Sequence, residues 1–144
     1  MIKVIILIAI ITLGVITCSS NSGKALIDAA MDGNFEKVKL LIEKGADIDA
    51  KDNDGVTALM YVSRAGDLEI AKYLVENGTD INAKDSDRGY TALIYAAEYV
   101  NLEIVQFLIE SGADVNIKNN DGKTALDLAE TEEIKEVLRK AGAK

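Results

Sequence analysis

A segment of about 33 residues recurs along this chain, and an internal repeat limits the possible folds more than any other sequence feature. Two motifs mark the repeat, a Thr-Ala-Leu triplet that starts at Thr57, Thr91 and Thr124, and a Gly before an Asp-containing stretch at Gly45, Gly78 and Gly112. A single insertion near Arg88 explains why one spacing in each series is 34 instead of 33. Repeats of this length bury their apolar faces only by stacking, so the sequence predicts an elongated stack.

Each repeat is expected to contain two short helices. In the second repeat, the Thr57 hydroxyl can accept a first-turn N–H, and apolar residues follow at helical spacing until Gly66. A second apolar face runs from Leu68 to Val75 and closes at Gly78. Neither helix buries its face alone, so stability must be shared between neighbouring repeats, with about three as the minimum.

The stretch LEIVQFLIESGADVN at residues 102–116 resembles the second half of an ankyrin repeat almost position by position. The resemblance covers residues 24–142 and implies an all-α ankyrin-repeat solenoid of stacked helix-turn-helix units with β-hairpin-like finger loops. We expect one domain at 24–144, with units at about 24–51, 52–84, 85–118 and 119–142. The first unit lacks the opening turn and the last has a shortened middle, so both are expected to cap the stack.

The chain departs from the family pattern at two places. Where the family has Thr-Pro-Leu-His, this chain has TALM, TALI and TALD, and it contains no Pro or His at all. Ala lacks the preset backbone angle of Pro, so each unit is expected to lose a little stability. Val100 stands where Gly33 and Gly66 end the inner helices of their units. A β-branched residue is strained at positive φ, so this turn is expected to change conformation or to be locally weak.

The first 17 residues follow a different pattern, which predicts an export signal. Lys3 is their one charge, and the apolar run from Val4 to Ile16 is too short for the roughly 20 residues that span a membrane.

The segment VITC at residues 15–18 resembles the lipobox of bacterial lipoproteins, although Thr17 stands where that family usually has Gly, Ala or Ser. The resemblance implies that Cys18 is lipidated and that residues 18–23 form a lipid-bearing tether. The protein would then be exported and anchored in the cell envelope, on the periplasmic or surface side, touching the membrane only through its lipid. Ordinary cleavage that leaves a free thiol and an uncleaved anchor are the alternatives.

Composition excludes several classes of chemistry. Without His there is no Ser/His/Asp triad or imidazole ligand, and one Cys makes no internal disulfide or multi-cysteine metal site. The formal net charge of −8, or −9 once Lys3 is removed with the signal, argues against nucleic acid as a partner. No glycine-rich phosphate loop is present. We therefore expect no catalysis, no cofactor and no metal.

Two acidic patterns suggest chemistry, and in both a plain turn is the favoured interpretation. The sequence DNDG at residues 52–55 resembles the start of a calcium loop, but Ala50 and Tyr61 occupy positions where that loop needs ligands. Asp54 and Asp87 are a candidate acid–base pair, yet exposed finger tips lack the burial that shifts a carboxyl pKa.

The family resemblance implies that a partner protein is gripped by the finger turns and the exposed side of the inner helices. Carried over position by position, that surface comprises Asn53, Asp54, Val56, Arg64, Lys84, Ser86, Asp87, Tyr90, Glu98, Tyr99, Lys118, Asn120, Asp121 and Lys123. Tyr90, Tyr99 and Arg64 are the candidate anchors, because aromatic and Arg side chains dominate binding at interfaces. Tyr61 and Tyr95 lie one turn earlier and are open to two interpretations, partner contact or packing between repeats.

The leading hypothesis is a non-catalytic protein–protein interaction module anchored in the bacterial cell envelope. An inhibitor or immunity-type protein that neutralises a toxin or enzyme is the alternative. A metal-dependent or enzymatic protein is less favoured, and a purely structural or self-associating repeat protein is a further possibility. Fold analogy alone does not choose among partners.

Overall fold

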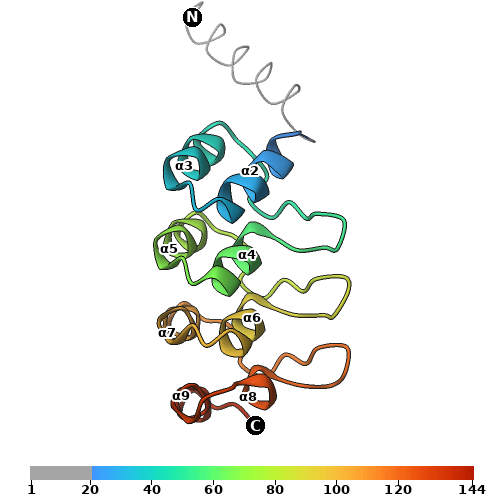
Figure 1. Ribbon diagram of the computed structural model, residues 1–144, viewed down its shortest axis with the longest axis vertical. Coiled ribbons are helices and arrows are strands. Elements are labelled where there is room, and N and C mark those ends of the chain that lie inside the picture. Colours follow the sequence, from blue (N-terminus) through green and yellow to red (C-terminus); the bar gives the residue numbers. More distant parts are fainter. Residues whose placement is uncertain (1–20) are drawn as a thin grey trace, which may run out of the picture.

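The computed structural model describes residues 21–144, which fold into eight α-helices without a β-strand. The helices are α2 (Asn21–Met31), α3 (Phe35–Glu43), α4 (Ala58–Ala65), α5 (Leu68–Glu76), α6 (Ala92–Glu98), α7 (Leu102–Glu110), α8 (Ala125–Leu128) and α9 (Glu132–Lys140). Consecutive helices form four pairs that stack along one direction, with long loops projecting from one side (Figure 1). The predicted all-α solenoid is therefore confirmed.

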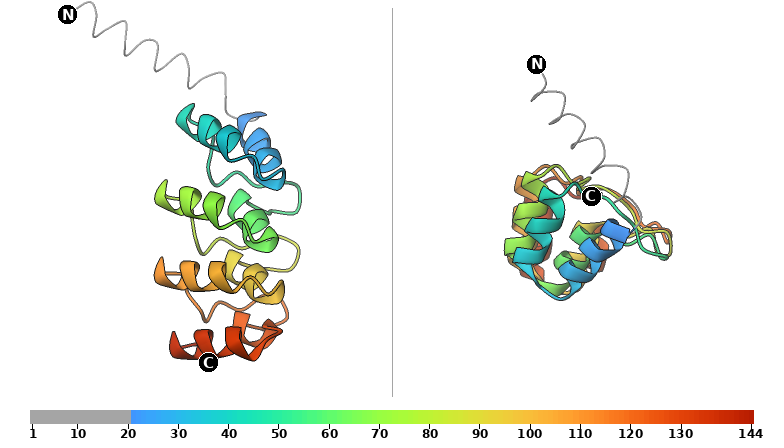
Figure 2. Two further views of the ribbon diagram at one scale, coloured as in Figure 1. Left: turned by 60° about the vertical axis from the view of Figure 1, so that its left-hand side comes forward. Right: turned by 90° about the horizontal axis from the view of Figure 1, so that it is seen from above.

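The pairs align so that the helices form two columns. The inner column contains α2, α4, α6 and α8, and the outer column contains α3, α5, α7 and α9, each helix packing on its neighbour in the same column. Seen from above, the loops between pairs superpose as a row of fingers beside the inner column (Figure 2). The surface formed by fingers and inner helices is thus continuous across units.

The core runs along the whole stack between the two columns. Its largest fully buried side chains come from every helix pair: Leu26, Val38, Leu59, Met60, Ile70, Leu74, Leu93, Ile94, Ile104, Leu108, Ile134 and Leu138. Full burial of one such side chain stabilises a fold by roughly 1.5–3 kcal/mol. Because each pair buries its residues against the next, stability is shared between neighbouring units, as the repeat predicts.

The substituted TPLH motifs still cap the inner helices. The predicted cap at Thr57 is confirmed, since its Oγ1 accepts a hydrogen bond from the Met60 N–H at 3.4 Å. In return, the Thr57 N–H donates to the Met60 sulfur at 3.5 Å, and the Thr124 N–H donates to Asp127 Oδ2 at 2.8 Å. Met60 and Asp127 both occupy the family's His position, so at two of three sites the replacement residue accepts from the capping Thr.

The turn after α6 keeps a left-handed backbone without glycine. Val100 has a φ of 63° and, within residues 21–144, is the one non-glycine residue at positive φ. The equivalent residues Gly33 and Gly66 have φ values of 65° and 86°. The Val100 side chain is 47% exposed, so little burial offsets a strain of roughly 1–2 kcal/mol. Of the two expected outcomes, the turn therefore retains its conformation and carries the strain.

The N-terminal boundary corrects one prediction. Helix α2 begins at Asn21, so residues 21–23, assigned to the tether from their sequence, form the start of a packed helix. Gly23 is buried, and a Cβ placed there would lie 2.5 Å from the Ala50 side chain, which explains why the smallest residue is found in this helix. The export signal and Cys18 lie outside the described residues. None of the helices in the described part is long and apolar enough to cross a membrane.

Candidate protein-binding groove

Each finger is organised by one polar side chain at its base. Asp52 Oδ1 accepts hydrogen bonds from the N–H groups of Asp54 and Val56, both at 2.9 Å. Asn119 Oδ1 does the same for the last finger, accepting from Asp121 at 3.0 Å and Lys123 at 2.9 Å. The DNDG pattern thus forms a side-chain-stabilised turn. Across residues 21–144 no group of three or more His, Cys, Asp or Glu residues is arranged to hold a metal ion.

The finger with the insertion is built around a buried carboxylate. Asp85 is 5% exposed, and its Oδ1 accepts from the N–H groups of Arg88 at 2.8 Å and Gly89 at 2.9 Å. Its Oδ2 accepts from the Tyr95 hydroxyl at 2.8 Å. Tyr61 makes the matching bond to Asp52 Oδ2 at 2.7 Å in the preceding unit. Both tyrosines therefore brace a finger against an inner helix, which favours packing over partner contact for Tyr95.

Hydrogen bonds between units hold the fingers in register. The Ser86 N–H donates to the Asp54 carbonyl at 2.8 Å, and Asn120 donates through Nδ2 to the Asp87 carbonyl at 3.0 Å. The Lys84 ammonium spans to the next finger and donates to the Lys118 carbonyl at 2.7 Å. These bonds order the binding surface before any partner arrives, which lowers the entropic cost of binding.

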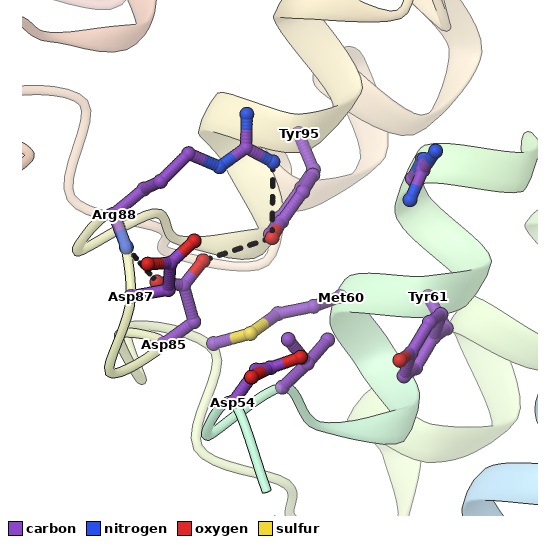
Figure 3. Close-up of a pocket in the computed structure, with 9 residues that line it drawn as sticks. Asp54, Met60, Tyr61, Asp85, Asp87, Arg88 and Tyr95 are labelled. Atoms are coloured by element: carbon purple, nitrogen blue, oxygen red, sulfur yellow. Dashed lines mark hydrogen bonds between the residues drawn. The ribbon is translucent and has the colours of Figure 1, made fainter. Parts of the chain in front are cut away.

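Arg88 is the centre of an aromatic and acidic cluster in the third unit. Its Cζ lies 4.1 Å from the Tyr90 ring centre and 5.4 Å from that of Tyr95, and its Nη1 lies 3.7 Å from Glu98 Oε2. Figure 3 shows the Arg88 side chain extending toward Tyr95, beside the finger that carries Asp85. Burial raises the pKa of Tyr95 to about 12, with the Asp85 hydrogen bond acting in the same direction and Arg88 opposing.

Tyr90 is packed inside this cluster, which corrects its assignment as an exposed anchor. It is 6% exposed, its ring meets that of Tyr95 edge-on at 5.2 Å, and its hydroxyl donates to Glu98 Oε1 at 3.0 Å. Burial, together with the bond to Glu98, raises its pKa. The inserted Arg88 covers the ring, so Tyr90 supports the finger of the third unit instead of offering a free aromatic surface.

Tyr99 and Arg64 lie together on the exposed side of the inner helices. Tyr99 follows α6 and is 41% exposed, and the Arg64 guanidinium from α4 lies 4.8 Å above its ring centre. Met31, at the end of α2, is 56% exposed nearby and lines the same hollow. Three units thus contribute one large side chain each to a single patch.

The side formed by the fingers and inner helices contains three adjoining hollows, which together we call the groove. The finger hollow, of about 170 Å³, is lined by Asp54, Val56, Met60, Tyr61, Arg64, Asp85, Asp87, Arg88 and Tyr95. The helix-end hollow, of about 270 Å³, is lined by Met31, Tyr61, Arg64, Ala65 and Tyr99. The first-unit hollow, of about 260 Å³, is lined by Lys24, Ile27, Asp28, Met31, Lys51, Asp52 and Asn53. Met31 lines two of them, and Tyr61 and Arg64 line another two, so the hollows adjoin along shared side chains.

The candidate binding residues fall into three environments. Those that line the groove are Asn53, Asp54, Val56, Arg64, Asp87 and Tyr99. Those engaged in bonds within or between fingers are Lys84, Ser86, Lys118, Asn120, Asp121 and Lys123, several through their backbone. Tyr90 and Glu98 belong to the Arg88 cluster. The structure therefore gathers six of the fourteen candidates around the groove.

Several residues that line the groove were not among the candidates, and Met31 and Arg88 show why. Met31 belongs to the first unit, which has no opening finger, so the family pattern does not place it beside the later units. Arg88 is the inserted residue and has no counterpart in the repeat. Its signal was available in the sequence, since Arg88 stands directly before the finger glycine Gly89, where the other two fingers have Asp54 and Asp121.

Two family models match the chain. One, described as ankyrin repeats in three copies, matches residues 4–85, and one described as ankyrin repeats in many copies matches residues 86–129. None of the curated proteins searched matches this chain. The chain belongs to the ankyrin-repeat family, whose members are generally non-catalytic modules that bind other proteins.

Proposed function

We propose that this protein binds one partner protein in the groove, catalyses no reaction, and is held in the cell envelope by a lipid on Cys18. The observation that carries the binding proposal is the row of adjoining hollows with Met31, Arg64 and Tyr99 exposed along it. Met, Arg and Tyr are the side-chain types enriched where protein interfaces concentrate their binding energy.

The groove is also preorganised. The fingers are already bonded to one another through Ser86, Lys84 and Asn120, so a partner meets a surface with little conformational freedom left to lose. The hollows hold only about 170, 260 and 270 Å³, and the patch comes from three helix pairs. Such a surface suits a folded protein or an extended segment better than a small molecule, which needs an enclosed site.

Crosslinking on intact cells, followed by affinity recovery of the tagged full chain, tests the binding proposal. Joint substitution of Arg64→Ala and Tyr99→Ala should reduce recovery of the crosslinked partner at least about tenfold, because hot-spot residues contribute most of the affinity. Leu40→Ala is the matched control, since Leu40 is 47% exposed on α3 of the outer column. Equal recovery by the double variant and the control would refute the groove as the binding surface.

The anchoring proposal rests on the lipobox-like residues 15–18 and needs its own test. Wild-type protein should incorporate labelled palmitate and sediment with membranes, since several acyl chains anchor stably where one binds only marginally. Cys18→Ser should abolish labelling. Thr17→Ala, which restores a residue typical of the lipobox, should label at least as well as wild type. Absence of label on the wild-type chain would contradict lipidation.

A further inference from the structure

Four cations beside the finger hollow and its neighbours already have partners within the protein. The Lys51 and Lys84 ammonium groups donate to carbonyl oxygens of the next finger, at 3.1 and 2.7 Å. Arg88 lies over Tyr90 and faces Glu98, and Arg64 lies over Tyr99. Each of these positive charges therefore has an internal partner, either a carbonyl dipole, a ring face or a carboxylate.

The anions of the finger hollow are not used in this way. Asp54 and Asp87 are exposed on successive fingers, and in the described part of the chain neither carboxylate has a hydrogen bond or an ion pair. Asp85, beside them, is buried and satisfied by three donors. Figure 3 shows Asp85 and Asp87 together on one finger and Asp54 on the neighbouring finger, with the Tyr95 hydroxyl between the Asp85 carboxylate and the guanidinium of Arg88. The finger hollow thus presents two unpaired negative charges.

The next hollow along the groove is apolar in character. The helix-end hollow is bordered by Met31, Ala65 and Tyr99, and it shares Tyr61 and Arg64 with the finger hollow. A segment lying in the groove would therefore meet carboxylates at the fingers and, immediately beside them, thioether and aromatic surface. These two environments require two kinds of side chain in one partner.

We infer that the groove binds a positively charged protein segment, with a Lys or Arg side chain between Asp54 and Asp87 and a neighbouring aliphatic side chain against Met31 and Tyr99. This inference rests on the proposed function and specifies its partner class. The formal net charge of −8 favours the same partner, because an acidic protein attracts a basic one over a distance of about a Debye length. The aliphatic residue supplies most of the affinity, and the charges supply orientation and association rate.

Short fluorescent peptides test this charge preference directly on the purified full chain in a nonionic detergent. The probe is a blocked hexapeptide in which two leucines are flanked by lysines, and its binding is measured by anisotropy. Replacing the lysines by glutamates, or the leucines by glycines, should weaken binding at least about tenfold. Binding of the lysine–leucine peptide should also weaken as salt is raised.

Charge-matched variants assign the effect to the groove. Joint Asp54→Asn and Asp87→Asn substitution should weaken the lysine–leucine peptide about fivefold, as expected for two exposed ion pairs. Joint Glu69→Gln and Glu103→Gln substitution changes net charge equally on the outer helices and should leave binding unchanged. Equal effects of the two double variants, or no binding of this peptide, would overturn the inference. Tighter binding of the glutamate peptide would also overturn the inference. The proposed function is tested separately, by recovery of the crosslinked partner from cells.

Discussion

The guanidinium carbon of Arg64 lies 4.8 Å from the ring centre of Tyr99, and the contact joins the second helix pair to the third beside the helix-end hollow. An exposed cation–aromatic contact of this kind contributes roughly 0.5–1 kcal/mol. The two residues are therefore available for binding without being essential to the fold.

A double-mutant cycle measures that contact. Arg64→Ala, Tyr99→Ala and the joint variant should each lower the free energy of unfolding by no more than about 1–2 kcal/mol, with a coupling of about 0.5 kcal/mol or more between the two sites. Urea denaturation followed by circular dichroism gives the four values. Strict additivity would show that the observed contact does not stabilise the stack.

Relief of strain at Val100 should stabilise the protein. Val100→Gly removes a left-handed backbone strain of roughly 1–2 kcal/mol. Glycine loses more conformational entropy on folding, which costs roughly 0.5–1 kcal/mol. We therefore expect the free energy of unfolding to rise by about 0.5–1 kcal/mol. The reverse change, Gly66→Val, should lower the free energy of unfolding by more than Val100→Gly raises it, because the new Cβ would also lie 2.9 Å from Asn101 Oδ1. Urea midpoints measure both variants. A lower midpoint for Val100→Gly would contradict the strain.

Asp85 and Asp87 should differ sharply although they lie two residues apart. Asp85→Ala leaves the Tyr95 hydroxyl and two backbone N–H groups without their acceptor, and we expect a loss of about 2–4 kcal/mol. Asp87→Ala removes an exposed carboxylate and should stay within about 0.5 kcal/mol of wild type. Thermal and urea unfolding separate the two outcomes, and similar losses would contradict the assigned role of Asp85.

The Tyr61 phenol should make stability depend on alkaline pH. Its hydrogen bond to Asp52, with burial, raises its pKa from 10.0 to about 12. Because the folded pKa is higher than the unfolded one, this contribution is complete below pH 10 and is lost as pH rises toward about 12. Tyr61→Phe should therefore lose less stability than wild type between about pH 10 and 12 in urea titrations. Parallel pH profiles for the two proteins would refute this linkage.

Most of the fold could be predicted from the sequence because its determinants are local and repeat every 33 or 34 residues. The cap at Thr57 and the helix stop at Gly66 each depend on a residue and its near neighbours, and both are as expected. The predicted start of the first unit, at residue 24, was too late, because Gly23 is typical of a linker in sequence. Its packing against Ala50 depends on a contact that no local pattern shows.

The groove could be predicted only in part, because exposure is decided between units. Tyr90 occupies the finger position held by Val56 and Lys123 in other units, and sequence alone makes it an exposed anchor. The inserted Arg88 and the carboxylate of Glu98 enclose it instead. Side chains eight residues apart determine that enclosure, and the insertion itself breaks the repeat from which the prediction was made.

Site-specific photocrosslinking tests the central claim most directly, because it reports which surface touches the partner. A benzoylphenylalanine residue placed at Tyr99 or at Met31 should, on illumination of intact cells, link the chain to one and the same protein. The same residue placed at Leu40, which is equally accessible on the outer column, should yield no such product. Crosslinks from Leu40 to that protein, with none from Tyr99 or Met31, would contradict binding in the groove.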